Sequence, residues 1–377
     1  MRADNFFERK WARVRDHMRR EGMAALVLSE NGRTRYVSGY QRYYLGTYLP
    51  FVHAAVLTLD AGPVLLLPRH IMGFAEECVA EKVVEFPLGQ EGKIDIVART
   101  LSDLGVAKSR IGLEFDFVQY GFMVPLKERL REAEIVDASP MMSRVTAIKF
   151  PEELDLIRES ARMVGKGMAA AIEASQEGVT ELEVARRSTQ AMFAEGAEAM
   201  NFVAIRSGPH AWRLSPLNTM RRIEKGDCVQ IDVGCMHQGY TSDMNRTAVV
   251  GEPTDEQRKL LRVGQAMLEA GIAAVRPGVR GSEVWRASFE AAEKAGMADR
   301  VTIPFTGHGI GLGLHEEPYI FAGSDTILEE NMALALEPGV YAVGIGGSRP
   351  EDMLFVTATG HEVLTHYPYD YDMLASR

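Results

Sequence analysis

The chain has 377 residues, of which 46% are hydrophobic and 25% are charged, a composition typical of a soluble globular protein long enough for two domains. Its formal charge of -10 excludes the clustered basic surface that nucleic-acid binding needs. No apolar run reaches the ~18 residues of a membrane span. The N-terminus MRADNFFERK also lacks the apolar core of a signal peptide, so we expect a cytoplasmic protein without a membrane partner.

The first 150 residues alternate between helical and strand patterns. Helices are expected near residues 6–21, 94–104 and 118–132. Strands are expected near residues 24–29, 53–59, 63–68, 83–87, 111–115 and 135–138. This alternation predicts an N-terminal α/β domain.

A domain boundary is expected near Phe150-Pro151, because the residue before a proline disfavours helix and a proline can open the next helix at its first turn. We therefore predict two domains, residues 1–148 and residues 149–377. The three cysteines form an odd set without CxxC spacing, which favours core thiols over a disulfide framework or a zinc finger. They are Cys78, Cys228 and Cys235.

From Pro151 onward the pattern changes to long helices, and the sequence repeats with a shift of 100 residues. Residues 161–197 and 261–297 share twelve identical positions without a gap. Helices rich in Ala and Glu could match by composition alone, but the Gly-Val turns at Gly178 and Gly278 also coincide. The repeat predicts two helix-turn-helix units, each followed by strands, in a domain with internal pseudo-twofold symmetry.

After the first repeat, the segment VQIDVGCMHQGYTSDMNRT alternates apolar and polar residues around Asp232. Its period of two places the Asp232 carboxylate on the face opposite Val229, Ile231 and Val233, away from the main core. Asp243 follows a Gly-Tyr turn, so the two aspartates can face each other across a hairpin. Two surface acids that cap turns are the alternative for this pair taken alone.

The segment FTGHGIGLGLHEEP contains His308 between two glycines, which allow close backbone approach to a ligand, and His315 seven residues later. It is not a dinucleotide-binding loop, because no GxGxxG opens a helix here. Glu337 lies in ALALEPGVY, where a carboxylate within an apolar strand is costly unless it meets a cation. Glu351 lies in GGSRPEDMLFVT, two residues after Arg349.

Asp232, Asp243, His308, Glu337 and Glu351 thus supply four carboxylates and one imidazole. Hard oxygen ligands with a single nitrogen suit two divalent ions such as Mn, Co, Zn or Fe that share bridging carboxylates. Thiolate sites have a different ligand set. The sequence does not decide between these metals.

These segments resemble those of the pita-bread metallopeptidases, which include methionine aminopeptidase, aminopeptidase P, prolidase and the metal-free relative creatinase. The resemblance spans roughly residues 150–365, and a weaker one, to the N-terminal domain of the creatinase and prolidase branch, covers the rest. It implies a creatinase-like α/β domain followed by a pita-bread domain, with all five residues as ligands of a dinuclear centre. It also implies that the protein is a homodimer.

The resemblance further implies that Glu337 takes a proton from the metal-bridging water and passes it to the leaving nitrogen. His315 corresponds to a histidine that hydrogen-bonds the scissile carbonyl region and stabilises the developing oxyanion. Arg349 is available to keep a ligand carboxylate ionised and is a candidate contact near the substrate.

One position departs from the family pattern. Where prolidases, aminopeptidases P and creatinase have a histidine, eleven residues before the glycine of the GD turn, this chain has Ser215 in RSGPHAWRLSPLN. Either His210 has taken over this role, or the substrate differs from an Xaa-Pro peptide. Arg213 could pair with a substrate carboxylate, and Trp212 could form one side of a pocket for a small apolar or ring group of the substrate. Simple packing and contact with solvent are equally compatible with both residues.

A second candidate for substrate selection is an aromatic segment of the N-terminal domain. It comprises Tyr40, Tyr43, Tyr44, Tyr48, Phe51 and His53. In creatinase-like dimers this domain leans over the partner's active site, so the segment is either a lid or part of its own domain's packing.

We therefore expect a dinuclear metal-dependent hydrolase that cleaves an amide bond in small peptides, of the Xaa-Pro dipeptidase or aminopeptidase type. The first alternative is a metal-dependent C–N hydrolase or lyase that acts on a small non-peptide metabolite, as ectoine-hydrolase-like and creatinase-like members do. The second is a binding module that keeps the fold without catalysis.

Overall fold

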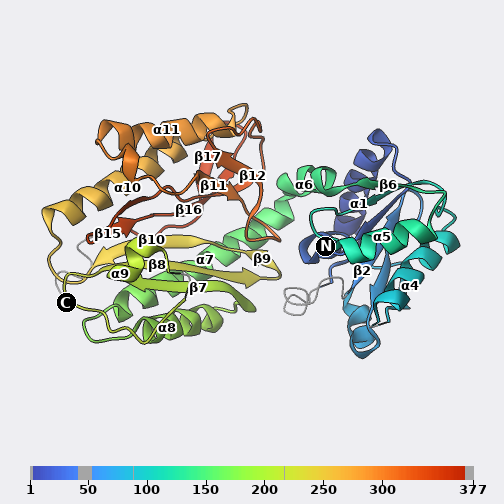
Figure 1. The fold of residues 1–377 in the computed structure, drawn as a ribbon, viewed down its shortest axis with the longest axis horizontal. Coiled ribbons are helices and arrows are strands. Elements are labelled where there is room, and N and C mark those ends of the chain that lie inside the picture. Colours follow the sequence, from blue (N-terminus) through green and yellow to red (C-terminus); the bar gives the residue numbers. More distant parts are fainter. Residues whose placement is uncertain (1–2, 41–52, 88, 216, 370–377) are drawn as a thin grey trace. The chain divides into compact units, whose positions relative to one another are not determined.

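Figure 1 shows the computed structural model, which describes residues 3–40, 53–87, 89–215 and 217–369. The chain forms two compact units, Met1–Thr146 and Ala147–Arg377. Within the described residues, no helix combines the length and the apolar character that crossing a membrane requires.

The N-terminal unit is built on one six-stranded mixed sheet with the order β4-β3-β2-β1-β5-β6. β1 is antiparallel to β2 and parallel to β5, while β3–β4 and β5–β6 are parallel pairs. The strands are β1 (Ala25–Leu28), β2 (Ala54–Thr58), β3 (Val64–Leu67), β4 (Lys82–Glu85), β5 (Arg110–Leu113) and β6 (Glu134–Asp137). All six strands predicted for this unit are confirmed within two or three residues.

The helices of this unit are α1 (Ala3–Arg20), α2 (Asn31–Ser38), the 3-10 segment η1 (Arg69–Glu77), α4 (Gln90–Asp103), α5 (Tyr120–Arg129) and α6 (Ser139–Ala147). Apolar residues of α4 and α5, such as Val97 and Leu126, pack against strand residues such as Val27 and Ile111 in one buried cluster. The three longest helices were predicted from the sequence, whereas α2, η1 and α6 were not.

The C-terminal unit contains two pairs of helices and two main sheets. The helices are α7 (Pro151–Ala174), α8 (Glu181–Ala194), α9 (Pro209–Arg213), α10 (Asp255–Ala274), α11 (Gly281–Lys294) and the 3-10 segment η2 (Ala298–Arg300). Phe150 precedes Pro151 with an extended backbone, and its N–H donates to the Glu153 carboxylate at 2.8 Å, so α7 begins where the proline predicted.

The first sheet has the order β10-β8-β7, with β9 paired to β8, and the second has the order β12-β11-β13-β16-β17. The strands of the first are β7 (Ala199–Ser207), β8 (Cys228–His237), β9 (Tyr240–Thr241) and β10 (Met244–Val249). Those of the second are β11 (Phe305–Gly309), β12 (Glu316–Phe321), β13 (Ala333–Leu336), β16 (Asp352–Val356) and β17 (His361–Val363). β14 (Val340–Ala342) and β15 (Gly346–Ser348) form a separate hairpin.

The two helix pairs repeat each other as the 100-residue sequence shift predicts. α8 and α11 occupy residues exactly 100 positions apart at both ends, and each follows a glycine of positive φ, Gly178 at 83° and Gly278 at 84°. The backbone N–H of each glycine donates to the segment that precedes a strand, Gly178 to the Ile223 carbonyl before β8 and Gly278 to the Leu328 carbonyl before β13. Equivalent main-chain contacts in both halves argue for duplication rather than chance composition.

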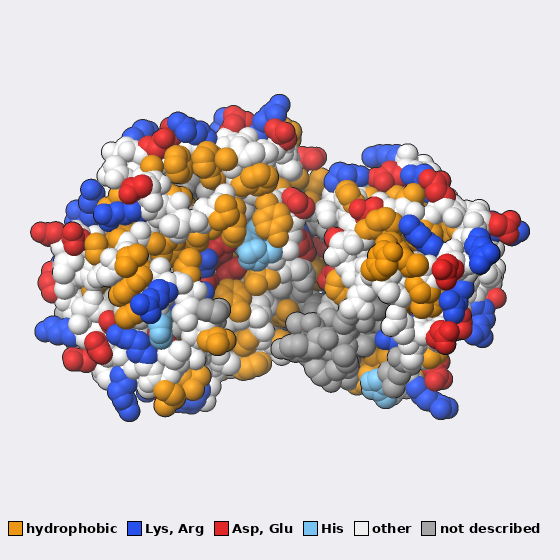
Figure 2. Space-filling view, in the orientation of Figure 1, with side chains coloured by type: hydrophobic (Ala, Val, Ile, Leu, Met, Phe, Trp, Pro, Cys, Tyr) orange, Lys and Arg blue, Asp and Glu red, His pale blue; other side chains and the backbone are white. Residues whose placement is uncertain are grey.

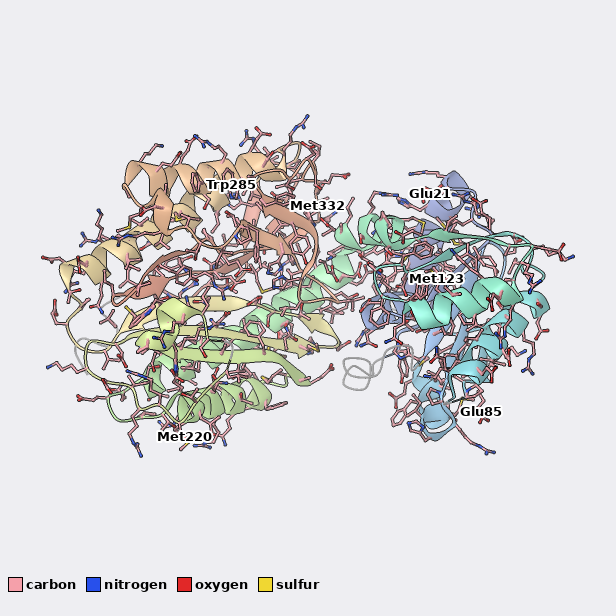
Figure 3. The ribbon with its side chains drawn as sticks, in the orientation of Figure 1. Glu21, Glu85, Met123, Met220, Trp285 and Met332 are labelled. Atoms are coloured by element: carbon pink, nitrogen blue, oxygen red, sulfur yellow. The ribbon has the colours of Figure 1, made fainter. Side chains whose placement is uncertain are left out.

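Each helix pair covers one face of one sheet, and in Figure 1 α10 and α11 lie above the strands and α8 lies below them. Ile231 and Val233 of β8 pack with α7 and α8. Leu334 and Leu336 of β13 belong to the cluster that includes Trp285 of α11 and Met332, both labelled in the same upper layer of Figure 3. Alternate residues of these strands therefore point to the inner faces, where polar side chains gather.

Candidate metal centre

Strand β8 carries Asp232 on its inner face, directly opposite Asn245 of β10 and Ala204 of β7. Asp243 lies immediately before β10, whose first residue, Met244, pairs with Val233. Both aspartates are 3% exposed. The hairpin of β8 and β10 thus brings them together, as predicted.

The second sheet contributes the other three ligand-type residues. His308 of β11 pairs with Ala335 of β13, which points away from the Leu334 and Leu336 side. Glu337 directly follows β13, and its N–H donates to the Thr306 carbonyl at 2.7 Å. The strand pairing therefore sets His308 and Glu337 beside each other.

A backbone bridge links the two sheets at the site. Glu351, the residue before β16, pairs with Asn245 of β10, and its N–H donates to the Asn245 carbonyl at 3.0 Å. Because Asn245 also lies opposite Asp232, this bridge places the Glu351 carboxylate next to the two aspartates.

The five residues form overlapping groups whose ligand atoms lie within 4.8 Å of one another. Asp232, Asp243 and Glu351 make one group, and His308, Glu337 and Glu351 make another. His315 joins Asp243 and His308 in a third. Figure 2 shows acidic side chains in a recess of the C-terminal unit with a histidine beside them.

Arg349 holds two of the carboxylates at once. Its Nη2 contacts Asp232 Oδ2, and its Nη1 lies 2.9 Å from Glu337 Oε2. Although burial opposes ionisation, the nearby Arg349 and His308 keep the pKa of Glu337 below its usual value. The predicted role of Arg349 in stabilising a ligand carboxylate is consistent with these ion pairs, which involve Asp232 and Glu337.

The other two carboxylates lack such a partner. Burial, followed by repulsion from neighbouring carboxylates, raises the pKa of Asp243 and of Glu351 well above their usual values. Both oxygens of Glu351 and Oδ1 of Asp232 and of Asp243 are buried without a hydrogen-bond partner among the described residues. Enclosed carboxylate oxygens without donors are what a divalent cation satisfies.

The orientation of His308 fits the same conclusion. Nδ1 lies 2.9 Å from the Gly309 carbonyl, an acceptor, so Nδ1 donates there and Nε2 is the nitrogen that faces the cluster. That Nε2 lies 3.2 Å from Glu337 Oε1 and 3.9 Å from Asp243 Oδ2. Nε2 is buried without a hydrogen-bond partner among the described residues, so this nitrogen and the surrounding carboxylate oxygens form a donor set that fits divalent metal ions.

His315 lies at the rim of this cluster. Its ring stacks on that of His308 with centroids 3.7 Å apart and an interplanar angle of 13°. Partial burial and the neighbouring His308 lower the pKa of His315 to about 4. A neutral, exposed imidazole next to the cluster can donate or accept a hydrogen bond at a substrate.

The loop that departs from the family pattern lies beside β7. His210 of α9 makes a 2.8 Å contact through Nδ1 with Glu181 Oε1, a fully buried carboxylate that Ser207 and Thr219 also contact. His210 belongs to none of the metal-capable groups found among the described residues. Trp212 is half-buried and Arg213 is exposed at the end of α9.

Ser215 contributes its backbone carbonyl, which accepts a 2.8 Å hydrogen bond from Nε of Arg206. Arg206, on β7, is 8% exposed and its Nη1 donates to Asp232 Oδ2 at 2.9 Å and to Gln230 Oε1 at 3.0 Å. Neither Arg206 nor Gln230 was among the residues predicted from the sequence. The alternation along β8 that singled out Asp232 also places Gln230 on the inner face, which was the available signal.

The aromatic segment of the N-terminal unit is only partly described, and Tyr43, Tyr44, Tyr48 and Phe51 lie outside the described residues. The rings of Tyr40 and His53 have centroids 4.9 Å apart. Both residues are buried, at 4% and 2% exposure, which is consistent with packing for these two.

Comparison with known proteins places this geometry in context. Residues 155–358 match the model of metallopeptidase family M24, and residues 10–148 match the creatinase/prolidase N-terminal domain. The chain is 31% identical over 365 residues to "Probable dipeptidase PepE" of Mycobacterium tuberculosis, an alignment that covers 94% of this chain and 96% of the relative.

Solved structures agree with these matches. The prolidase of Pyrococcus horikoshii OT3 has a TM-score of 0.86 at 27% identity, with 96% of this chain and 99% of that chain covered. Dipeptidase PepE of Mycobacterium ulcerans has a TM-score of 0.86 at 29% identity, with 98% of each chain covered. The predicted fold, an α/β creatinase-type N-terminal domain followed by a pita-bread domain, is confirmed.

Proposed function

Because this chain belongs to metallopeptidase family M24, in the branch of prolidase and aminopeptidase P, we propose that it is a metal-dependent dipeptidase of the Xaa-Pro type. The buried cluster of four carboxylates and one histidine is the observation that carries this proposal, because four of its enclosed oxygens lack donors among the described residues. Relatives named dipeptidase and Xaa-Pro dipeptidase support a small peptide as the substrate. The full ligand set argues against a binding module without catalysis.

Asp232, Asp243, His308, Glu337 and Glu351 would hold two divalent ions, with manganese, cobalt, zinc and iron all compatible with the ligands. The chemistry that such ions supply when bound is polarisation of the scissile carbonyl and activation of a water molecule as nucleophile. Arg349 would orient Asp232 and Glu337 for this task through the ion pairs described above.

Two side chains would act on the substrate itself. Glu337, ionised beside Arg349, would accept the proton of the attacking water and pass it to the nitrogen of the leaving residue. His315, exposed at the rim and neutral, would donate a hydrogen bond to the carbonyl oxygen as negative charge develops on it.

Ser215 favours one alternative, a metal-dependent C–N hydrolase or lyase that acts on a non-peptide metabolite. Its side chain stands where the family has histidine, and His210 is engaged with Glu181 instead. The same cluster would act on a peptide bond or on the C–N bond of a metabolite. The contacts that Arg206, Trp212 and Arg213 make with the substrate therefore decide between the two functions.

The proposal is tested by incubating the protein, loaded with Mn, Co, Zn or Fe, with three sets of compounds. These are Xaa-Pro dipeptides, longer Xaa-Pro peptides and small cyclic or betaine-like metabolites. We expect dipeptides to be hydrolysed and the metal-free protein to be inactive. Turnover of a metabolite alone would replace the peptidase assignment with the alternative.

We also propose that the protein is a homodimer, as the resemblance to creatinase-like enzymes predicts. Light scattering coupled to size-exclusion chromatography measures the oligomeric state. A mass near that of one 41.7 kDa chain would contradict the dimer.

A further inference from the structure

A second arginine stands beside the carboxylate cluster. Arg206 of β7 lies directly opposite Gln230 of β8 in the strand register, so both side chains point to the inner face that carries Asp232. Its Nη1 donates to Asp232 Oδ2 and to Gln230 Oε1, and its Nε donates to the Ser215 carbonyl. These three hydrogen bonds fix the plane of the guanidinium group.

The remaining edge of the Arg206 guanidinium is open. Within the described chain, Nη2 makes no hydrogen bond or ion pair, and it is not among the enclosed polar atoms that lack partners. This nitrogen therefore faces accessible space one side chain away from the cluster. An oriented guanidinium with a free N–H edge is a binding group for a carboxylate.

Arg206 differs from the other arginines that could take this role. Both Nη atoms of Arg349 face carboxylates, Asp232 and Glu337. Arg213 is exposed at the end of α9, with no hydrogen bond or ion pair to the described part of the chain. Arg206 is both fixed in place and open at one edge.

The position next to Asp232 limits which substrate carboxylate Nη2 can reach. In a dipeptide, the α-carboxylate is attached to the Cα of the leaving residue and lies about 4 Å from the reacting carbonyl carbon. Each further residue moves the C-terminal carboxylate away by up to about 3.5 Å. A group that contacts a cluster residue directly therefore matches a dipeptide rather than a longer peptide.

We propose that Arg206 is a specificity-determining residue that binds the free C-terminal carboxylate of a dipeptide through Nη2. This inference rests on the proposed dipeptidase function and adds a residue and a recognition chemistry to it. Arg206 favours dipeptides over dipeptide amides and over tripeptides because only the dipeptide brings a carboxylate to its open edge.

The test measures calorimetric binding of alanyl-proline and of alanyl-prolinamide to the manganese-loaded Glu337→Gln protein, in which turnover is expected to be at least about 100-fold slower. We expect the dipeptide to bind about 10- to 100-fold more tightly than its amide, the range of a hydrogen bond between charged groups. Adding Arg206→Gln should reduce this ratio to near one without changing binding of the amide. Adding Arg262→Ala, the matched control at an exposed arginine of α10, should leave the ratio unchanged.

Manganese content is measured in every variant because Arg206 contacts Asp232. Equal weakening of both ligands, together with loss of manganese, would show that Arg206 only positions Asp232 and would overturn the inference. Arg206→Lys, which keeps the charge, should retain part of the preference and covers the case in which the glutamine variant does not fold. Equal binding of the dipeptide and its amide by the Glu337→Gln protein with Arg206 intact would also overturn the inference.

The two proposals fail in different ways. If the metal-loaded wild-type protein hydrolyses no dipeptide while Glu337→Gln still binds alanyl-proline through Arg206, the dipeptidase function is wrong and the recognition role of Arg206 stands. If dipeptides are hydrolysed and the amide preference does not depend on Arg206, only the further inference is wrong.

Discussion

The buried carboxylates of the site differ in how their charge is stabilised. Glu337 faces Arg349 and His308, which keep its pKa low, whereas Asp243 and Glu351 face mainly other carboxylates. A base must be ionised to accept a proton, so this difference favours Glu337 as the proton acceptor over its two neighbours.

Replacing Glu337 with glutamine tests that role. We expect Glu337→Gln to lower kcat by about 100-fold or more while the protein stays folded, because an amide cannot accept and release a proton. Steady-state kinetics and metal analysis of the same sample measure both effects. Turnover close to wild type in metal-loaded Glu337→Gln would contradict the assignment.

The ligand-type residues could be selected from the sequence because each lies in a short motif with a turn residue or an alternating strand pattern. Arg206 could not be selected, because its position opposite Gln230 depends on the register of β7 against β8. That register contains an irregularity between Met200 and Phe202, which no sequence pattern indicated.

At the scale of elements, β11 is enclosed on both sides, by β12 and by β13. The two glycines that flank His308 permit this packing. A Cβ on Gly307 would overlap the Ala335 carbonyl oxygen, and a Cβ on Gly309 would overlap the Glu317 carbonyl oxygen. The sequence motif GHG is therefore explained by the close approach of neighbouring backbones.

We expect Gly309→Ala to destabilise the C-terminal unit by about 1–3 kcal/mol, because β11 or β12 must shift to accommodate the methyl group. The shift moves His308 as well, so metal affinity should fall. Gly165→Ala is the matched control: it lies within α7 with no atom near the added methyl group, and alanine favours helix. Urea unfolding measures the stability of both variants, and metal titration measures their metal affinity. Equal free energies of unfolding would contradict the packing argument.

Elements that lack a clear hydrophobic pattern or a capping signal were not predicted from the sequence. Helix α2 is only eight residues long, and its N-cap is Glu30, whose carboxylate accepts from the N–H groups of Gly32 and Arg33. Glutamate is not among the residues that usually mark a helix start, so no signal preceded this helix. The strands β1, β2 and β3, with nearly continuous apolar residues, gave a clear signal.

The N-terminal sheet also contains a buried acid. Glu114 follows β5, accepts from the N–H of Glu30 at 2.9 Å, and is fully buried, which raises its pKa to about 7 from 4.5. Between these two pH values the folded chain holds a proton that the unfolded chain has lost. Its contribution to stability is therefore complete below pH 4.5 and is lost as pH rises through 7.

We expect Glu114→Gln to flatten the decline in stability of the N-terminal unit between about pH 5 and pH 7, by on the order of 3 kcal/mol across this range. Hydrogen exchange of β1 and β5 peptides, compared with wild type at each pH, reports the difference. Asp116→Asn is the control: the pKa of Asp116 is lowered, so this side chain is ionised in both states over the same range. An unchanged slope in Glu114→Gln would contradict the shift.

At the scale of the whole molecule, the site depends on both halves of the duplicated unit. The first half supplies Asp232 and Asp243, and the second supplies His308, Glu337 and Glu351. The Asn245–Glu351 bridge joins the two sheets at this point. Neither half alone provides a complete ligand set, so the site requires both halves to be folded.

Removing metal should therefore loosen one unit and spare the other. Four enclosed carboxylates face two arginines, so without cations their repulsion lowers the stability of residues 147–377. Ligand at about 1,000 times its Kd stabilises a fold by about 4 kcal/mol, so the chelated protein should lose stability on that scale.

Hydrogen exchange with and without chelator resolves the effect by peptide: those of β8, β11 and β16 should exchange faster, while those of the N-terminal unit should not change. Asp243→Asn, which weakens the ligand set, should reduce the difference that chelator makes. Protection that is identical with and without chelator, after manganese loading is verified, would mean that the cluster is stable without cations and is not a metal centre.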